Sequence, residues 1–293
     1  MKTIIISGSS GFIGKNLINL ISQTNKYQII TLDINNGIDL TQNEQLLSLP
    51  SFEIFIHLAN LLYVPASYQN PEVFYRVNYL TTLNALELCR KNNAKMIYIS
   101  SYLYGNPVYL PIDENHPINP TNPYAQSKYI CEKLCEGYYR DFKIKIIILR
   151  PFNIYGIGQK GDLLIPEIIK QLKQGKNKIY LKDPYPRRDY INVIDVARAI
   201  IKAIDINEDY TITIEDYTIY NVCSGISYSV KEITEIFNSK LKYPVQFIFS
   251  KSDRQHEIDE TRGSYSKIEK ELNWHPLVKF EDGIEAILNK ENL

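Results

Sequence analysis

The sequence predicts an α/β fold in which a doubly wound parallel sheet occupies the first half of the chain and a smaller mixed lobe follows it. Apolar runs in the first half are continuous, which is typical of strands that are buried on both faces. These runs alternate with segments of helical periodicity, as in a parallel sheet covered by helices on both sides. After Arg150 the alternation weakens, and helical segments mix with short strands and a polar stretch at 250–267.

Five runs in the first half have the length and composition of buried strands: TIIIS at 3–7, YQIITLD at 27–33, EIFIHLA at 53–59, KMIYISS at 95–101 and IKIIILR at 144–150. Helical patterns lie between them at 12–24, 71–93 and 123–142, and later ones at 163–174, 193–204 and 229–240. We expect residues 1–152 with roughly 187–224 to form one domain. The second lobe would then comprise roughly 153–186 with 225–293.

Composition excludes several classes of protein. The 293 residues include 33 Lys and Arg and 33 Asp and Glu, with no basic block, so sequence-independent nucleic-acid binding is not expected. The apolar run that opens the chain ends at Ser7 and is too short for a signal peptide, and no stretch has the length of a membrane span. We expect a cytoplasmic protein. Cys131 and Cys135 are one helical turn apart, but no further Cys or His completes a metal site, so no metal is expected.

A glycine motif follows the first strand directly. Gly8, Gly11 and Gly14 have the spacing G-x-x-G-x-x-G, and a helix begins in the same segment. Glycines let the backbone turn tightly and approach a pyrophosphate, while the first helical turn, which includes Phe12 and Ile13, offers unpaired N–H groups. Because the order is strand, glycines and helix, the motif predicts a Rossmann-type dinucleotide site.

The acidic residue that ends the second strand bears on the choice of dinucleotide. A carboxylate at Asp33 can accept both ribose hydroxyls of an adenosine and would repel a 2′-phosphate, and no Arg follows it in INNGIDL. This favours NAD over NADP. Asp39 and Leu40 come only a few residues later, so the usual second helix is nearly absent and these residues are expected beside the adenine. Leu58 and Ala59 end the third strand, where their backbone would pass beneath the cofactor.

A Tyr-x-x-x-Lys pair lies on the helix that opens with Pro123, which suits a first helical turn because proline lacks an N–H. Tyr124 and Lys128 share one face of that helix, and Ser100 stands at the carboxyl end of a strand, the edge that faces the ligand crevice. A nearby ammonium and a positive nicotinamide ring should both lower the pKa of Tyr124. Its phenolate could then accept a proton from a sugar hydroxyl while the carbon gives up hydride. His57 is expected to be a packed core residue.

The chain resembles the extended short-chain dehydrogenase/reductases that act on nucleotide-sugars, including enzymes similar to UDP-glucose 4-epimerase. The resemblance covers nearly the whole chain, and these are the segments that carry it: GFIG at 11–14, HLA at 57–59, SSYLYG at 100–105, YAQSK at 124–128, RPFNIYG at 150–156, RRDYINVIDVA at 187–197, YNVCSG at 220–225 and ELNWHP at 271–276. It implies catalytic roles for Tyr124, Lys128 and Ser100.

The resemblance also implies a substrate, a nucleotide-diphosphate sugar. It places Arg188 and Arg254 on the diphosphate, Asn153 on the sugar or the phosphate, and Glu257 near the nucleotide ribose, and it puts Ser101 beside the sugar. Arg187 competes with Arg188 for its role. Sugar selectivity should depend on four positions around the pocket: Leu62, Tyr63, Tyr102 and Thr261. Relatives usually form homodimers that pair two helices per subunit, here 71–93 and 123–142.

Several reactions share this apparatus. A 4-epimerase oxidises C4, lets a transient 4-keto sugar turn over, and returns the hydride to the other face. A 4,6-dehydratase needs an Asp-Glu pair where this chain has Ser101 and Tyr102, which argues against dehydration. Asp33 favours tightly bound NAD and hence epimerisation. The alternatives are an NAD(P)H-dependent reductase of nucleotide 4-keto-6-deoxysugars, which the short 34–52 segment resembles, and a non-catalytic dinucleotide-binding regulator.

Overall fold

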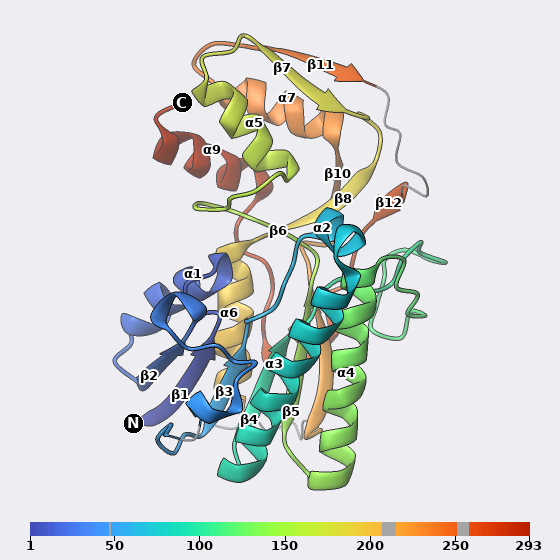
Figure 1. Cartoon of the computed structure of the whole chain (residues 1–293). Coiled ribbons are helices and arrows are strands. Elements are labelled where there is room, and N and C mark those ends of the chain that lie inside the picture. Colours follow the sequence, from blue (N-terminus) through green and yellow to red (C-terminus); the bar gives the residue numbers. More distant parts are fainter. Residues whose placement is uncertain (47, 207–214, 251–257) are drawn as a thin grey trace.

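The structure is a computed structural model that describes residues 1–46, 48–206, 215–250 and 258–293. It consists of a lower part built on a parallel sheet and an upper lobe of helices and short strands (Figure 1). Within the described residues, the large sheet has the order β2-β1-β3-β4-β5-β9, and all its pairings are parallel. Its strands span Lys2–Ser7 (β1), Tyr27–Leu32 (β2), Ile54–His57 (β3), Lys95–Ile99 (β4), Ile146–Pro151 (β5) and Tyr217–Val222 (β9).

All five predicted strands of the first half are present. β9, which comes much later in the chain, joins the sheet beside β5. The chain moves from β1 outward to β2 and then returns to the opposite side of β1 for β3. This reversal creates a switch point between β1 and β3, where ligands of open α/β sheets bind beyond the carboxyl ends of the strands. The fold class is therefore confirmed, while the division of the chain into two domains stays a prediction.

Helices cover both faces of the sheet. α1 (Phe12–Ser22) packs with α6 (Val193–Ile204) on one face, and α3 (Pro71–Asn92) with α4 (Pro123–Phe142) on the other (Figure 1). Successive residues of β1 point to opposite faces, as a strand requires. Ile4 and Ile6 enter the core beneath α1 and α6, and Ile5 enters the core beneath α3 and α4.

The connection from β2 to β3 holds two short 3₁₀ turns, Ile34–Asn36 and Asn43–Leu46, where a doubly wound fold usually has a helix. The sequence analysis predicted this abbreviation. A short helix, α2 (Val64–Gln69), follows β3 and precedes α3.

The upper lobe has a core of its own, formed by α5 (Leu164–Lys173), α7 (Val230–Lys240), α9 (Phe280–Glu291) and the parallel pair β7 (Lys178–Lys182) and β11 (Gln246–Ser250). A second sheet, β10 (Ser227–Ser229), β8 (Arg187–Asn192) and β12 (Glu260–Thr261), connects the lobe to the lower part, and β6 (Asn153–Tyr155) also pairs with β8. α8 (Ser266–Leu272) contacts β9. Sequence analysis did not identify α2, α8 or α9.

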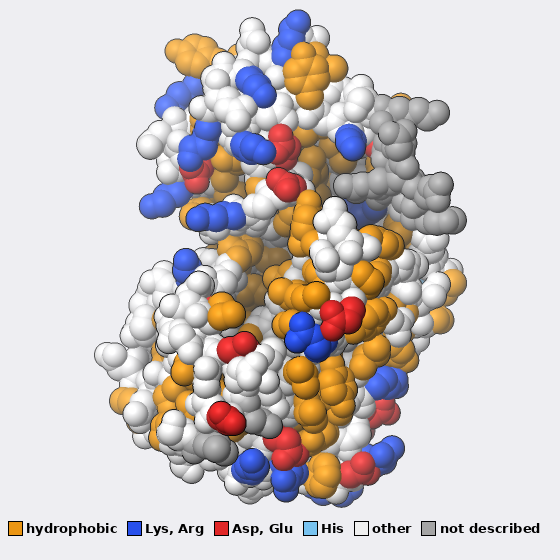
Figure 2. Space-filling view, viewed as in Figure 1, with side chains coloured by type: hydrophobic (Ala, Val, Ile, Leu, Met, Phe, Trp, Pro, Cys, Tyr) orange, Lys and Arg blue, Asp and Glu red, His pale blue; other side chains and the backbone are white. Residues whose placement is uncertain are grey.

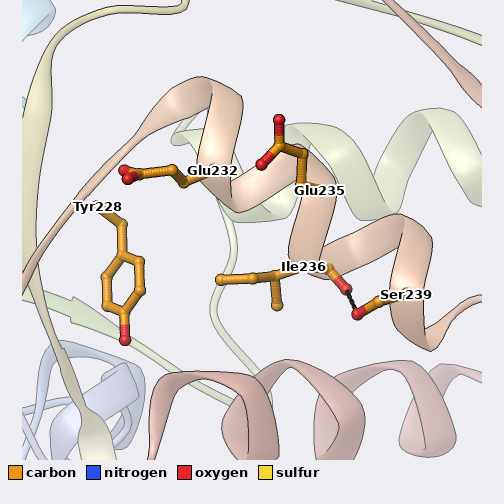
Figure 3. A pocket seen from close by; sticks show the side chains of 5 residues that line it. All are labelled: Tyr228, Glu232, Glu235, Ile236 and Ser239. Carbon is orange, nitrogen blue, oxygen red and sulfur yellow. Dashed lines mark hydrogen bonds between the residues drawn. The ribbon is translucent and has the colours of Figure 1, made fainter.

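A shallow hollow lies on α7 in this lobe, lined by Tyr228, Glu232, Glu235, Ile236 and Ser239 (Figure 3). Glu232 is already engaged by the backbone N–H and hydroxyl of Ser229, and the Ser239 hydroxyl donates to the Ile236 carbonyl. None of the described residues predicted to bind cofactor or substrate lines this hollow. Several of the predicted residues instead line two hollows nearer the sheet.

A buried ion pair joins the sheet to α4. The Arg150 guanidinium on β5 donates from Nε and Nη2 to the two carboxylate oxygens of Glu132 on α4, at 2.9 and 2.5 Å. Its Nη1 donates to the Tyr104 hydroxyl at 2.9 Å, which in turn donates to Asn221 Oδ1 on β9 at 2.6 Å. The side chains of Arg150 and Glu132 are only 2% and 3% exposed. Because every partner is buried, removal of one charge leaves the other without compensation.

We predict that Glu132→Ala lowers the free energy of unfolding by about 3–5 kcal/mol, because it leaves a buried guanidinium unpaired. Urea unfolding monitored by circular dichroism would measure the change. Glu72→Ala is the matched control, since Glu72 pairs with Arg76 on the surface at exposures of 73% and 57% and such pairs contribute little. Equal effects of the two substitutions would contradict the prediction.

Candidate functional site

The glycine loop after β1 is shaped for close backbone approach. Gly8 has φ +68°, and a Cβ there would lie 2.7 Å from the Ala59 backbone nitrogen; a Cβ at Gly14 would lie 2.5 Å from the Gly8 carbonyl oxygen. Gly11 precedes α1, and no side chain caps this end of the helix. Phe12, Ile13 and Gly14 form the first turn. The helix therefore presents backbone N–H groups and its positive end, the elements that bind a pyrophosphate.

A hollow of about 330 Å³ lies beside this loop, and we call it the sheet-edge hollow. Seven residues predicted to bind the cofactor line it: Gly8, Gly11, Asp33, Asp39, Leu40, Leu58 and Ala59. Its two carboxylates are held in place by local bonds. Asp33 accepts the backbone N–H of Ser10 at 2.9 Å and that of Asn35 at 3.0 Å, and Asp39 accepts the backbone N–H of Thr41 at 2.9 Å.

Charge in the sheet-edge hollow has one sign. Asp33 and Asp39 are acidic, and the residues described as lining the hollow include no Lys or Arg. A 2′-phosphate would meet carboxylates without a compensating cation, whereas ribose hydroxyls can donate to them. The glycine cradle and these acceptors fit NAD better than NADP.

Tyr124 and Lys128 lie one turn apart on α4, whose start is capped by Asn122 Oδ1 accepting the Ala125 N–H at 2.8 Å. Lys128 is buried, with 1% of its surface exposed. Its Nζ donates to the Ile99 carbonyl at 2.6 Å and lies 4.3 Å from the centre of the Tyr98 ring. Burial lowers the pKa of Lys128 to about 8. The carbonyl and the ring both favour a cation in this position.

The expected lowering of the Tyr124 pKa is not found in the protein alone. Tyr124 is buried, and desolvation raises its pKa, while a hydrogen bond with Ser101 acts in the opposite direction. Burial is the largest influence on this pKa, and the Lys128 ammonium is directed towards the Ile99 carbonyl instead. The prediction for the Tyr124 pKa considered the charges of Lys128 and of a nicotinamide ring. It did not include desolvation, because burial cannot be read from the sequence.

Ser100 follows β4 and is 4% exposed, and its hydroxyl has no partner among the described residues. A buried hydroxyl without a partner is suited to bind a ligand oxygen. His57 on β3 has both ring nitrogens engaged, Nδ1 with Ser7 Oγ at 2.9 Å and Nε2 with Thr82 Oγ1 at 3.2 Å. It stacks on the Tyr98 ring and is a core residue, as predicted.

A smaller hollow of about 120 Å³ lies between the lower part and the upper lobe, and we call it the inter-lobe hollow. The face drawn in Figure 2 is likewise hollowed between these two parts, with apolar side chains on its floor. Residues from both parts line the inter-lobe hollow, among them Tyr102, Asn122, Ala125, Asn153, Arg188 and Thr261. Ala125 directly follows Tyr124, so the smaller hollow borders the Tyr-Lys pair.

The two neighbouring arginines of β8 have different surroundings. Arg187 is committed to the lobe, since its Nη1 pairs with Glu232 at 2.7 Å and its Nη2 donates to the Ser227 carbonyl at 2.8 Å. Arg188 lines the inter-lobe hollow, and its Nη1 donates to the Ile258 carbonyl at 2.6 Å. Asn153 Nδ2 donates to the Asp189 carbonyl at 3.2 Å beside it. Of the pair, Arg188 is the better candidate for a diphosphate.

Some predicted residues are not brought together here. Arg254 and Glu257 lie outside the described residues. Of the positions expected to govern sugar selectivity, Tyr102 and Thr261 line the inter-lobe hollow and Leu62 lines the sheet-edge hollow. Tyr63 instead donates to Asp162 Oδ2 at 3.3 Å, in the loop before α5.

Sequence analysis missed two residues of the site. Tyr98 lies under Lys128, but its position within a strand indicated only a core side chain. Asn60 lines the sheet-edge hollow directly after Ala59. The available signal was its place just beyond the end of a strand, where polar side chains reach the ligand edge of the sheet.

Residues 4–223 match the NAD-dependent epimerase/dehydratase family, and the chain belongs to that family. A protein of Methanocaldococcus jannaschii, provisionally named a UDP-glucose 4-epimerase, is 31% identical over 98% of this chain and 97% of its own length. The GDP-6-deoxy-D-mannose reductase of Pseudomonas aeruginosa is 29% identical over 98% and 96%. The crystal structure of the Bifidobacterium longum UDP-glucose 4-epimerase with NAD+ and UDP is similar, with 26% identity, 99% and 98% coverage and a TM-score of 0.85.

Proposed function

We propose that this member of the NAD-dependent epimerase/dehydratase family is a nucleotide-sugar 4-epimerase that keeps NAD bound throughout its cycle. The observation that carries the proposal is that two features occur together. The first is the set of Tyr124, Lys128 and the Ser100 hydroxyl, which has no partner among the described residues. The second is the sheet-edge hollow, which is acidic and is lined by no described Lys or Arg. The first group supplies acid–base chemistry at a sugar hydroxyl. The second favours NAD, which an enzyme with a closed redox cycle can retain.

The proposed roles follow from the contacts of each side chain. Bound NAD would supply the hydride acceptor and, later, the hydride donor. Tyr124 accepts the proton of the C4 hydroxyl as the C4–H bond breaks, and it returns that proton when the hydride comes back to the other face of the keto sugar. Ser100 Oγ donates to the C4 oxygen, where negative charge develops. The hydrogen bond with Ser101 opposes the effect of burial on the Tyr124 pKa. The positive ring of bound NAD would oppose it as well, so binding of cofactor would favour the phenolate, and Lys128 is proposed to hold the nicotinamide ribose.

The proposed substrate is a nucleotide-diphosphate sugar whose diphosphate binds Arg188. A guanidinium offers planar donors that match phosphate oxygens, and Arg188 lines the inter-lobe hollow opposite the residues next to Tyr124. Asn153 is proposed to donate to the sugar or the phosphate, and Ser101 to contact the sugar. Arg254 and Glu257 keep their proposed roles on the diphosphate and on the nucleotide ribose.

A second candidate is an NAD(P)H-dependent reductase of nucleotide 4-keto-6-deoxysugars. The similarity to the Pseudomonas aeruginosa GDP-6-deoxy-D-mannose reductase supports it. So does the replacement of a second helix by 3₁₀ turns between β2 and β3. Dehydration is not proposed, because Ser101 and Tyr102 provide no carboxyl group. A regulator without turnover is disfavoured, because Tyr124, Lys128 and Ser100 are all present.

We also propose a cytoplasmic homodimer. The four cysteines are buried free thiols, as in proteins of reducing compartments. None of the described helices is long and apolar enough to span a membrane. Apolar side chains cover much of α3 and α4 on the face drawn in Figure 2. Tyr79 on α3 and Ile130 on α4 are 39% and 38% exposed and line a groove between the two helices.

The released cofactor distinguishes the two reactions. Purified protein, denatured without added nucleotide, should release close to one equivalent of NAD+ or NADH, because an epimerase returns the hydride within one catalytic cycle. Chromatography of the supernatant identifies and quantifies the nucleotide. If the purified protein releases no nucleotide and later prefers NADPH in binding assays, the epimerase proposal is refuted and the reductase is supported.

Substitution of the proposed acid–base group tests catalysis directly. Tyr124→Phe should lower kcat for nucleotide-sugar epimerisation by about 10²–10⁴-fold, because it removes the proton acceptor. The content of bound nucleotide should not change. Tyr138→Phe, on the same helix but hydrogen-bonded to Glu87, is the matched control. A Tyr124→Phe protein that turned over substrate at the original rate would refute the assignment.

The oligomeric state tests the proposed helix face. Light scattering should give twice the chain mass of 34.0 kDa, and Ile130→Glu should give the monomer mass, because a carboxylate in an apolar interface loses its hydration. Tyr243→Glu is the control, since Tyr243 is 81% exposed in the upper lobe. A dimer that persists in Ile130→Glu would rule out this face.

A further inference from the structure

Asn60 occupies the switch point of the sheet. It lies three residues beyond the end of β3, immediately after Ala59, whose backbone nitrogen would be 2.7 Å from a Cβ on Gly8. The glycine loop after β1 and the segment after β3 are therefore in contact there. Asn60 lines the sheet-edge hollow together with Ser10 and Gly11, at the place where a Rossmann-type fold binds the phosphates of its ligand.

Among the described residues, neither polar atom of the Asn60 carboxamide has a hydrogen-bond partner. Both Nδ2 and Oδ1 are shielded from solvent and make no hydrogen bond to any described residue. Buried amides in native proteins are normally satisfied, so such a group requires an explanation. The other described side-chain atoms of this kind are the single hydroxyls of Tyr98, Ser100 and Thr261. Asn60 thus presents both an unused donor and an unused acceptor.

The backbone on both sides of Asn60 is held by α3. Thr81 Oγ1 donates to the Ala59 carbonyl at 3.2 Å. Asn78 accepts the Leu61 N–H at 2.8 Å and donates to the Leu61 carbonyl at 3.3 Å. Asn78 Nδ2 also donates to Ser127 Oγ on α4 at 2.8 Å. These bonds fix the segment that carries Asn60, so its side chain is presented by a rigid support.

We propose that the Asn60 carboxamide binds the sugar-phosphate part of the dinucleotide, with Nδ2 donating to a phosphate or ribose oxygen and Oδ1 accepting from a ribose hydroxyl. A ribose hydroxyl both donates and accepts, and a phosphate oxygen accepts, so together they match the two unused functions of the amide. The neutral amide also avoids the repulsion that a third carboxylate would add to those of Asp33 and Asp39. This inference rests on the proposed function in that it requires a dinucleotide in the sheet-edge hollow.

The consequence is tighter retention of the cofactor. In the protein without nucleotide, the buried amide is unsatisfied and costs free energy; in the complex, both of its functions are paired. The difference between the two states appears as binding affinity. Asn60 therefore contributes to holding the cofactor, and it has no role in the proton transfer at Tyr124.

The test compares stability and affinity in Asn60→Ala and Asn60→Asp, in full-length protein freed of nucleotide. Without nucleotide, Asn60→Ala should melt at the same temperature as the original protein or higher, because an unsatisfied amide has been removed. Its Kd for NAD+, measured by titration calorimetry, should rise about ten-fold. Asn60→Asp keeps the shape of the side chain but adds charge beside the phosphates. Its Kd should rise further, and more so at low ionic strength.

ADP-ribose locates the contact, because it lacks the nicotinamide ring. Asn60→Ala should weaken ADP-ribose by the same factor as NAD+. A loss confined to NAD+ would place Asn60 on the nicotinamide and overturn the sugar-phosphate assignment.

Asn78→Ala is the matched control for a structural asparagine. It should lower the melting temperature without nucleotide, since it strips the bonds to Leu61 and Ser127. If Asn60→Ala behaves in this way and binds NAD+ as tightly as the original protein, the inference fails while the proposed function stands. If the original protein binds neither NAD+ nor ADP-ribose, the proposed function fails as well.

Discussion

The buried pair of Arg150 and Glu132 is the interaction on which the geometry of the site depends. Glu132 lies one turn beyond Lys128 on α4, and Arg150 lies at the end of β5, next to the strand that leads to Ser100. Two parallel hydrogen bonds fix both the distance and the rotation of α4 against the sheet. Apolar packing restricts the position of α4 by shape, and the desolvated bidentate pair adds directional bonds that restrict it further. Tyr124 and Lys128 therefore face the strand end in one defined position.

The same pair is linked to the second lobe. Arg150 also donates to Tyr104, Tyr104 to Asn221, and Asn221 Nδ2 to the carbonyl of Ile112 at 3.1 Å. Ile112 in turn forms a bridge with Gly263, beyond β12. The network thus runs from α4 through β5 and β9 to the segment next to Thr261, which lines the inter-lobe hollow. It links the helix that carries Tyr124 and Lys128 to that hollow, and the proposed reaction needs such fixed positions.

Much of the fold could be predicted because strong local patterns coincide with buried elements. The strands at 3–7 and 144–150 are rich in isoleucine, a β-branched residue, and the helix at 123–142 opens with a proline directly after its cap, Asn122. β9 was missed because two polar residues, Thr218 and Asn221, interrupt its apolar run, and because it lies far along the chain from its partner β5. α8 has only seven residues, so its position depends on tertiary contacts. α9 does carry a helical signal, because its buried residues Phe280, Ile284, Ile287 and Leu288 recur at helical spacing, and that signal was overlooked.

In the site, the residue types could be predicted but their environments could not. The motif identified Tyr124 and Lys128, yet the direction of the Lys128 side chain is set by the Ile99 carbonyl and the Tyr98 ring, which no spacing rule shows. The sequence did not decide whether Arg187 or Arg188 faces the substrate. Adjacent residues of a strand point to opposite sides, and the pairing of β8 with its neighbours determines which side each arginine takes.

Retention of the cofactor is what connects the fold to the proposed reaction. A reductase must release its oxidised cofactor in every turnover, so very tight binding would limit its rate, whereas an epimerase regenerates the oxidised form in place and has no such limit. The features of the sheet-edge hollow all favour retention. A Cβ at Gly8 or Gly14 would clash with backbone atoms, and Asp33 is held in place by two backbone N–H groups. The Asn60 amide, which has no partner among the described residues, is proposed to gain its partners from the bound dinucleotide. Each of these lowers the free energy of the complex without adding a group that reacts. An enzyme that must exchange NADPH gains less from very tight binding, because tight binding slows release, and this is the physical reason to prefer the proposed epimerisation over reduction.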